Sequence, residues 1–205
     1  MNMNEYEQVK SYSYEEYVEY LQKKYGLAPA NYMTPTGTKN LYKNSRTSEG
    51  LVIHHKYEDR AFSLSHKSAV NIFPYEYQHA ENLVYCDYLE HLFLHVLIFE
   101  KINELYNNKW LLNGAFQFII PEINDVYSGW KTKESWRLKC HSVIINDKPV
   151  YMELIKRLII KKADLSELTK SFNSRFGIWS SNNNEVIYNE IKKIHDYIWH
   201  DGESV

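Results

Sequence analysis

The sequence predicts an α+β protein in which a small two-stranded element is embedded in a mainly helical chain. Three observations predict this class. Two short strand-like runs, GLVIHH (50–55) and AFSLS (61–65), are joined by the charged turn KYEDR (56–60). From Asn82 onward, one or two helices are expected, apolar on most faces near 91–99 and therefore buried. The C-terminal half shows further helical patterns, separated by glycine- and asparagine-containing breaks.

The N-terminal region divides into a helix and an irregular arm. Residues 13–25 carry apolar side chains near helical spacing, with Gly26 as a stop signal, so we expect a helix there. Residues 27–50 are rich in Pro, Gly, Thr, Asn and Ser, which is typical of irregular structure. In the C-terminal half, helices are expected around 115–127, 133–143, 148–162, 164–173 and 184–198. This organisation predicts three parts: 1–50, a core at 51–100, and a helical region at 101–205 that packs on the core.

Composition excludes several classes of protein. The 205 residues are 44% hydrophobic, which is enough for one large domain with a packed core. A net charge of −2 excludes a globally basic nucleic-acid-binding protein, so any such contact must use a local patch. The two cysteines form no CxxC pair, which argues against a zinc ribbon or a disulfide framework. The polar N-terminus and the short apolar stretch at 91–99 predict a cytoplasmic protein without a membrane partner.

Histidine spacing indicates a metal site. His91 and His95 are four residues apart, so on a helix both imidazoles lie on one face and can bind the same ion. Neutral imidazole suits divalent transition metals, which need a third ligand and an open position for catalysis. The adjacent His54 and His55 end a predicted strand. Alternation sends neighbours to opposite faces, but the twist at a strand end allows one to bind metal and the other to approach a substrate.

The order His54-His55, Asn82, then His91 nine residues later and His95 after four more resembles the HNH or ββα-metal (His-Me finger) nucleases. It is especially similar to the nuclease domains of DNase colicins. The lines that carry the resemblance are GLVIHHKYEDRAFSLS and ENLVYCDYLEHLFLH, which with their connecting loop cover less than a quarter of the chain. Two departures are a longer stretch between the histidine pair and the asparagine, and the absence of bracing CxxC pairs.

The resemblance implies a role for each of these residues. His54, His91 and His95 would hold one divalent ion (Mg, Mn, Ni or Zn), His55 would be the general base, and Asn82 would tether the loop. The implied activity is metal-dependent hydrolysis of phosphodiester bonds in DNA, in a restriction, phage, mobile-element or defence setting. The residue types suit this chemistry, because histidine titrates near neutral pH and a cation can offset the charge that develops on a phosphate.

Cations near the motif are candidates for nucleic-acid binding. Arg60 follows the hairpin turn and is a candidate for the scissile phosphate, while Lys39, Lys43 and Arg46 in the arm are candidates for the backbone. Segment 131–162 holds nine cations against three acidic residues and is a candidate phosphate-binding surface. For each of these side chains, simple solvent exposure is the alternative interpretation.

Two other functions stay open. A toxin-like ribonuclease would use the same site on RNA, although DNA is the favoured substrate. A non-catalytic nucleic-acid-binding protein would use the metal structurally, in a closed tetrahedral site. The sequence also leaves open whether the chain forms a homodimer.

Overall fold

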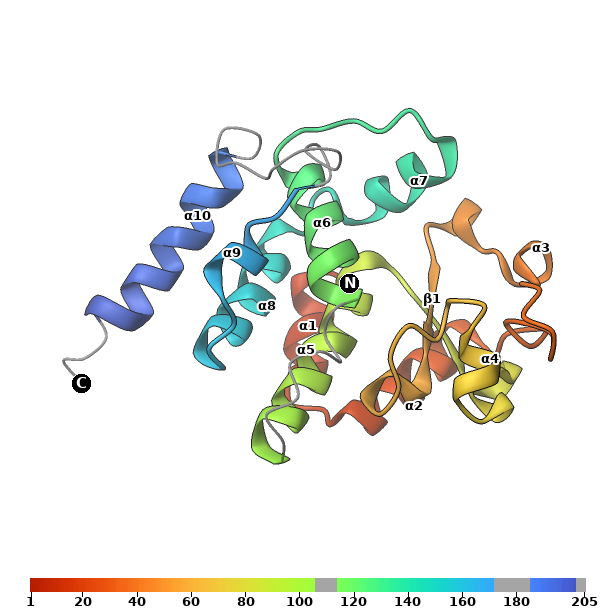
Figure 1. Ribbon diagram of the computed structural model, residues 1–205. Helices are drawn as coiled ribbons and strands as arrows, with labels where there is room; N and C mark the ends of the chain where they lie inside the picture. Colours follow the sequence, from red (N-terminus) through yellow and green to blue (C-terminus); the bar gives the residue numbers. More distant parts are fainter. Residues whose placement is uncertain (106–113, 172–184, 202–205) are drawn as a thin grey trace.

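Helix α5 (Tyr88–Leu105) runs through the middle of the computed structural model, which describes residues 1–105, 114–171 and 185–201 (Figure 1). Between Leu89 and Phe99 its apolar side chains are all buried, whichever face of the helix they occupy. A helix that is apolar all round is stable only when other elements surround it. Here the surrounding elements include α2 (Tyr14–Tyr25), α7 (Ser135–Ile144), α8 (Lys148–Ile160) and the two strands, β1 (Val52–His55) and β2 (Leu83–Cys86).

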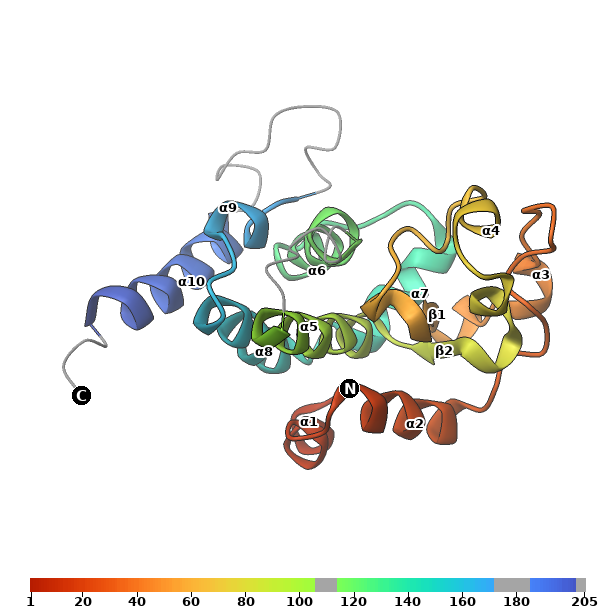
Figure 2. The same ribbon diagram turned by 60° about the horizontal axis from the view of Figure 1, so that its bottom comes forward.

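Two helices form the N-terminal region, α1 (Met3–Val9) and α2 (Tyr14–Tyr25), and Figure 2 shows both along the same side of the molecule. A capping box of Ser13 and Glu16 starts α2, and Gly26, with φ of 79°, ends it. Its buried face packs against α5 and β2. The helix predicted at 13–25 is therefore confirmed, whereas α1 was not predicted.

The sheet has two antiparallel strands, β1 (Val52–His55) and β2 (Leu83–Cys86), with His55 opposite Leu83. The prediction that AFSLS (61–65) forms the second strand is wrong, because the chain enters a 3-10 turn, η2 (Lys56–Asp59), directly after β1. The prediction of helix from Asn82 is also wrong for 83–86. This run is apolar and buried throughout, a pattern that suits a fully covered strand as well as a helix.

The remaining elements are short turns of helix before β2 and a series of helices after α5. The loops on either side of β1 contain α3 (Leu41–Asn44), η1 (Thr47–Glu49), α4 (Ala69–Ile72), η3 (Tyr75–Gln78) and η4 (Ala80–Asn82). After α5 come the π-helix η6 (Ala115–Ile119), α6 (Ile120–Tyr127), α7 (Ser135–Ile144), α8 (Lys148–Ile160), α9 (Leu165–Leu168), α10 (Glu185–Asp196) and the π-helix η8 (Tyr197–Asp201). Most C-terminal helices match the predicted ones to within a few residues. The helix predicted at 164–173 is too long, because α9 ends at Leu168 and residues 169–171 are not helical; residues 172 and 173 lie outside the described residues.

One hydrophobic core joins the two ends of the chain. Tyr6 and Val18 from the N-terminal helices share it with Phe93 of α5, Ile155 of α8 and Ile187 of α10. The ranges 1–50, 51–100 and 101–205 therefore contribute to a common core. Among the described residues, no helix combines the length and apolarity needed to cross a bilayer.

Candidate metal centre

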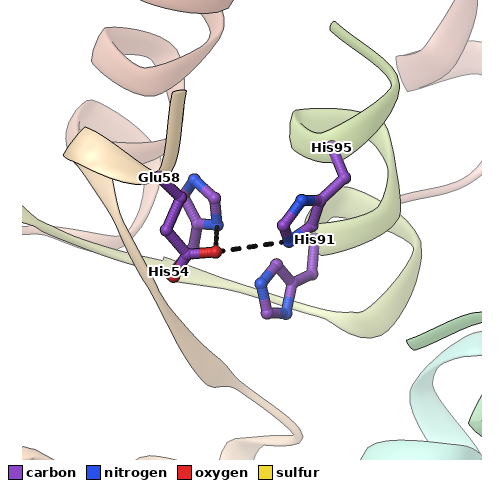
Figure 3. A group of neighbouring side chains, drawn as sticks. All are labelled: His54, Glu58, His91 and His95. Carbon is purple, nitrogen blue, oxygen red and sulfur yellow. Dashed lines mark ion pairs between the residues drawn. The ribbon is translucent and has the colours of Figure 1, made fainter. Parts of the chain in front are cut away.

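Four buried or half-buried side chains converge between the strands and α5: His54, Glu58, His91 and His95 (Figure 3). Each offers one ligand atom, and these atoms all lie within 4.8 Å of one another. The Oε2 atom of Glu58 is 3.5 Å from Nδ1 of His54 and 3.4 Å from Nε2 of His95. This group, called the metal cluster below, can hold a metal ion.

The path of the chain explains why the three histidines meet. Strand β1 ends beside the start of β2, and β2 ends two residues before α5 begins. His54 at the end of β1 therefore lies next to the first turns of α5, where His91 and His95 are one turn apart. The centroid of the His54 ring is 5.1 Å from that of His91 and 5.2 Å from that of His95, and the two α5 rings are 5.1 Å apart. The structure thus brings together the three residues predicted as metal ligands.

Glu58 is a cluster member that the sequence interpretation missed. The turn η2 reverses the chain after His55, so Glu58 returns toward the end of β1. Its Oε1 atom accepts a hydrogen bond from the backbone N–H of His55 at 3.2 Å. The sequence holds one signal that could have indicated Glu58 as a ligand. His54 and Glu58 are four residues apart, which is the same spacing as that of His91 and His95.

Burial keeps the cluster histidines neutral, and the neighbouring imidazoles add to its effect at His54 and His91. Burial lowers the pKa of His54 to about 3, although Glu58 opposes this shift. Burial also lowers the pKa of His91 and His95, and for His91 the other two imidazoles add to the effect. Burial alone would raise the pKa of the Glu58 carboxyl, but His54, His55 and His95 hold it well below its usual range. Neutral imidazoles beside a carboxylate are in the protonation state that metal ligands need.

Two buried nitrogens of the cluster have no hydrogen-bond partner among the described residues: Nδ1 of His54 and Nδ1 of His95. The other nitrogen of His54, Nε2, is hydrogen-bonded to the Tyr14 hydroxyl at 2.8 Å. A buried nitrogen without a partner destabilises the folded state unless a hydrogen-bond donor, a water molecule or an ion interacts with it. Nδ1 of His54 faces Glu58, so a cation between these side chains would satisfy it.

His55, the predicted general base, lies beside the metal cluster and contacts it through Glu58. Its Nδ1 is 3.3 Å from Oε1 of Glu58, and its ring packs edge-on against Tyr32, with ring centroids 4.5 Å apart. Its Nε2 is buried and has no hydrogen-bond partner among the described residues. Both side chains of the pair are buried, and both lie beside Glu58: Nδ1 of His54 is 3.5 Å from Oε2, and Nδ1 of His55 is 3.3 Å from Oε1.

Asn82 lies directly before β2, next to the residue that pairs with His55. Its side-chain amide donates a hydrogen bond to the backbone carbonyl of Glu76 at 2.8 Å. The amide thus links the end of the long loop to a point six residues earlier, in the place where the predicted tether would act.

Two clefts reach the metal cluster. One, of about 420 Å³, is lined by Glu58 and His95, and the other, of about 270 Å³, is lined by His91. The Glu58 side chain retains 18% of its exposure, and His91 is half-buried. Small molecules and solvent can therefore approach the cluster from two directions.

No family model matches this chain, and neither a curated protein nor a solved structure shows significant similarity to it. Its function is therefore inferred from the residues of the site.

Among the described residues, the candidate nucleic-acid-binding cations contact residues outside the metal cluster. Arg60 pairs with Asp59 next to it, while Lys39 and Lys43 lie over the rings of Tyr32 and Tyr42. Arg46 is held by two bonds to Glu49 and one to the backbone of Tyr25. Arg46 therefore stabilises the arm, and none of the four side chains bonds to the cluster among the described contacts.

The basic segment 131–162 also uses some of its cations internally. Arg137 pairs with Glu122, Arg157 pairs with Glu100, and Lys148 pairs with Glu190. These three cations bridge helices of the fold, which leaves a weaker basic surface than the sequence alone predicts.

Proposed function

We propose that this chain is a metal-dependent HNH-type endonuclease that hydrolyses phosphodiester bonds in DNA. The observation that carries the proposal is the meeting of His54, from a strand, with His91 and His95, from a helix, at one point. His55 lies directly beside them. The metal cluster lies between two antiparallel strands and the helix α5 that follows them, which supports the proposal, although the second strand is Leu83–Cys86 rather than the predicted 61–65.

The donor set fits a divalent transition metal. Three imidazoles and one carboxylate suit Zn, Mn or Ni better than Mg, which prefers oxygen ligands and water. When bound, such a cation would offset the negative charge that builds up on the phosphate and on the leaving oxygen. The two clefts at Glu58, His95 and His91 give a phosphate access to this place.

The remaining chemistry is assigned to His55. Because Glu58 Oε1 lies beside Nδ1, the ring hydrogen is held at Nδ1, and Nε2 is left as a base. In the proposed reaction Nε2 takes a proton from water, the water oxygen bonds to phosphorus, and the bond from phosphorus to the leaving oxygen breaks. A catalytic role would also account for a buried nitrogen that lacks a hydrogen-bond partner in the described structure.

Plasmid nicking tests the proposal. Wild type, His55→Ala and the exposed-histidine control His66→Ala are incubated with supercoiled DNA and Mg, Mn, Ni or Zn, with and without EDTA. We expect EDTA to abolish nicking and His55→Ala to reduce its rate by about 10²- to 10⁴-fold while metal binding persists. Nicking that survives EDTA, or that is equal in all three proteins, would refute the proposal. Cleavage of structured RNA without nicking of the plasmid would show that the protein is a ribonuclease, the alternative function.

The four-ligand set also favours a second candidate, a structural metal in a nucleic-acid-binding protein. Structural zinc sites are commonly closed by four protein ligands, which is the number found here. In that case metal removal would unfold the chain, as measured by circular dichroism, and His55→Ala would change no activity. A nuclease is favoured over this candidate because two clefts open onto the ligands.

A further inference from the structure

Three clefts that share lining residues lie next to one another, and two of them reach the metal cluster. The cleft at Glu58 and His95 shares Phe118 with the cleft at His91. The cleft at His91 in turn shares Val52 and Trp136 with a third cleft, of about 490 Å³. Three of the four cluster residues, Glu58, His91 and His95, therefore line neighbouring clefts. We call the three clefts together the Phe118–Trp136 groove, after the residues that they share.

Large aromatic side chains line this groove and are exposed along it. Phe62, after η2, is 42% exposed, Phe118 of the π-helix η6 is 61% exposed, and Trp136 of α7 is 44% exposed. Each of them lines at least one of the three clefts, and Phe118 lines both clefts that reach the metal ligands. Exposed aromatic surface gathered at one place marks a binding site, and aromatic faces stack well on nucleobases.

The groove has few cations for phosphates. Among the described residues that line the two clefts at the metal cluster, Arg137 is the only lysine or arginine, and it is paired with Glu122. Arg46 lines the third cleft and is paired with Glu49. Binding of a duplex depends on many cation–phosphate contacts, which this groove does not supply. The bases of a duplex are also stacked on one another, so they cannot lie on Phe118 or Trp136 without being unpaired.

We propose that the Phe118–Trp136 groove binds single-stranded nucleic acid, with unpaired bases stacked on its aromatic side chains. The inference builds on the proposed nuclease function and names its substrate class. Phe118 lines both the cleft at His91 and the cleft at His95 and Glu58, so a base stacked on its ring would bring the neighbouring phosphates toward these cluster residues. Stacking thus selects unpaired strands and presents their backbone to the metal cluster.

Binding of labelled oligonucleotides tests the inference. Fluorescence anisotropy is measured with a fluorescein-labelled oligothymidine and with a duplex of equal length, using zinc-loaded protein in a His55→Ala background to prevent cleavage. We expect the single strand to bind more tightly than the duplex. We expect Phe118→Ala and Trp136→Ala each to weaken single-strand binding by about 5- to 100-fold. Tyr197→Ala, which removes a ring that is 65% exposed on η8, is the matched control and should have no effect.

Salt dependence provides a second readout. Because few cations line the groove, the logarithm of the binding constant should fall with the logarithm of salt concentration at a slope of about −1. Equal binding of duplex and single strand, or no effect of Phe118→Ala, would overturn the inference even if the protein nicks plasmids. Conversely, single-strand binding by a protein that cleaves no nucleic acid would support the groove and refute the nuclease.

Discussion

The Tyr14 hydroxyl lies 2.8 Å from Nε2 of His54 and determines which nitrogen of that imidazole faces the metal cluster. The hydroxyl donates its only hydrogen to the backbone carbonyl of Lys56, also at 2.8 Å, so toward His54 it can only accept. Nε2 therefore carries the ring hydrogen, and Nδ1 presents its lone pair to Glu58. Tyr14 thus prepares His54 for metal binding from a position outside the cluster.

Tyr14→Phe should lower zinc affinity by about 10- to 100-fold, because the imidazole loses the bond that fixes its tautomer and orientation. A competition titration against a chromophoric chelator measures this affinity. Tyr17→Phe is the matched control, since Tyr17 is buried on the same helix and its hydroxyl contacts the sulfur of Met1. Wild-type affinity in Tyr14→Phe would show that Tyr14 does not orient the ligand.

Glu58→Gln should weaken metal binding by at least about 100-fold, since it removes the only negative charge of the metal cluster while keeping the side-chain size. The variant should also slow plasmid nicking beyond the effect of lower metal occupancy, because Glu58 contacts His55. Calorimetric titration with zinc and nicking at saturating metal separate the two effects. Glu76→Gln, an exposed change in the same loop, is the control. Unchanged zinc affinity would exclude Glu58 as a ligand.

Acid should destabilise the metal-free protein. The folded pKa of His54 is lowered to about 3, below its unfolded value, so in mild acid only the unfolded chain takes up this proton. The contribution of His54 to the free energy of unfolding is therefore fully present above about pH 6.5 and is lost progressively as the pH falls toward 3. For one such histidine the loss between about pH 7.5 and pH 5 is about 2 kcal/mol.

Urea unfolding at these two pH values checks this linkage. The difference in unfolding free energy between them should be about 2 kcal/mol smaller in His54→Gln than in wild type. His66→Gln, at an exposed position, should leave the difference unchanged. An unchanged difference in His54→Gln would mean that His54 does not resist protonation in the folded state.

Gly50→Ala should destabilise the protein by about 2 kcal/mol or more, through two separate effects. Gly50 has a φ of +85°, and an added Cβ would overlap the side chain of Val143 in α7. Gly129→Ala is the control for the first effect, since Gly129 has a φ of +83° with no atom within 4 Å of the added Cβ. In urea unfolding, the loss of unfolding free energy in Gly50→Ala minus the loss in Gly129→Ala measures the cost of the overlap. Adding Val143→Ala to Gly50→Ala should restore part of the lost free energy. Equal costs for the two glycines would show that the arm does not pack tightly on α7.

The parts of the fold that sequence reasoning predicted are those with local causes. Helix 14–25 follows from its apolar spacing, its capping box and Gly26, all of which are visible in the sequence. The shared direction of His91 and His95 follows from helical geometry alone. Both features are set within a few residues and need no knowledge of distant contacts.

The parts that it missed depend on tertiary contacts. The run Leu83–Cys86 is apolar at every position, so only its pairing with β1 and its cover by α2 decide that it is a strand. Glu58 and Asp59 are chemically similar neighbours in a charged turn. The 3-10 geometry of η2 directs Glu58 to the histidines, while Asp59 pairs with Lys101 of α5.

Because α5 carries two metal ligands and is also buried in the core from Leu92 to Phe99, apart from its polar side chains, the metal centre cannot be moved to another protein as a separate unit. A fragment comprising only 51–100 would leave Phe93, Leu97 and their apolar neighbours in contact with water, since α2 and α8 would be missing. Conversely, a change of volume anywhere along α5 would move the imidazoles relative to β1. Repacking the interior therefore offers a way to adjust ligand spacing without altering any ligand.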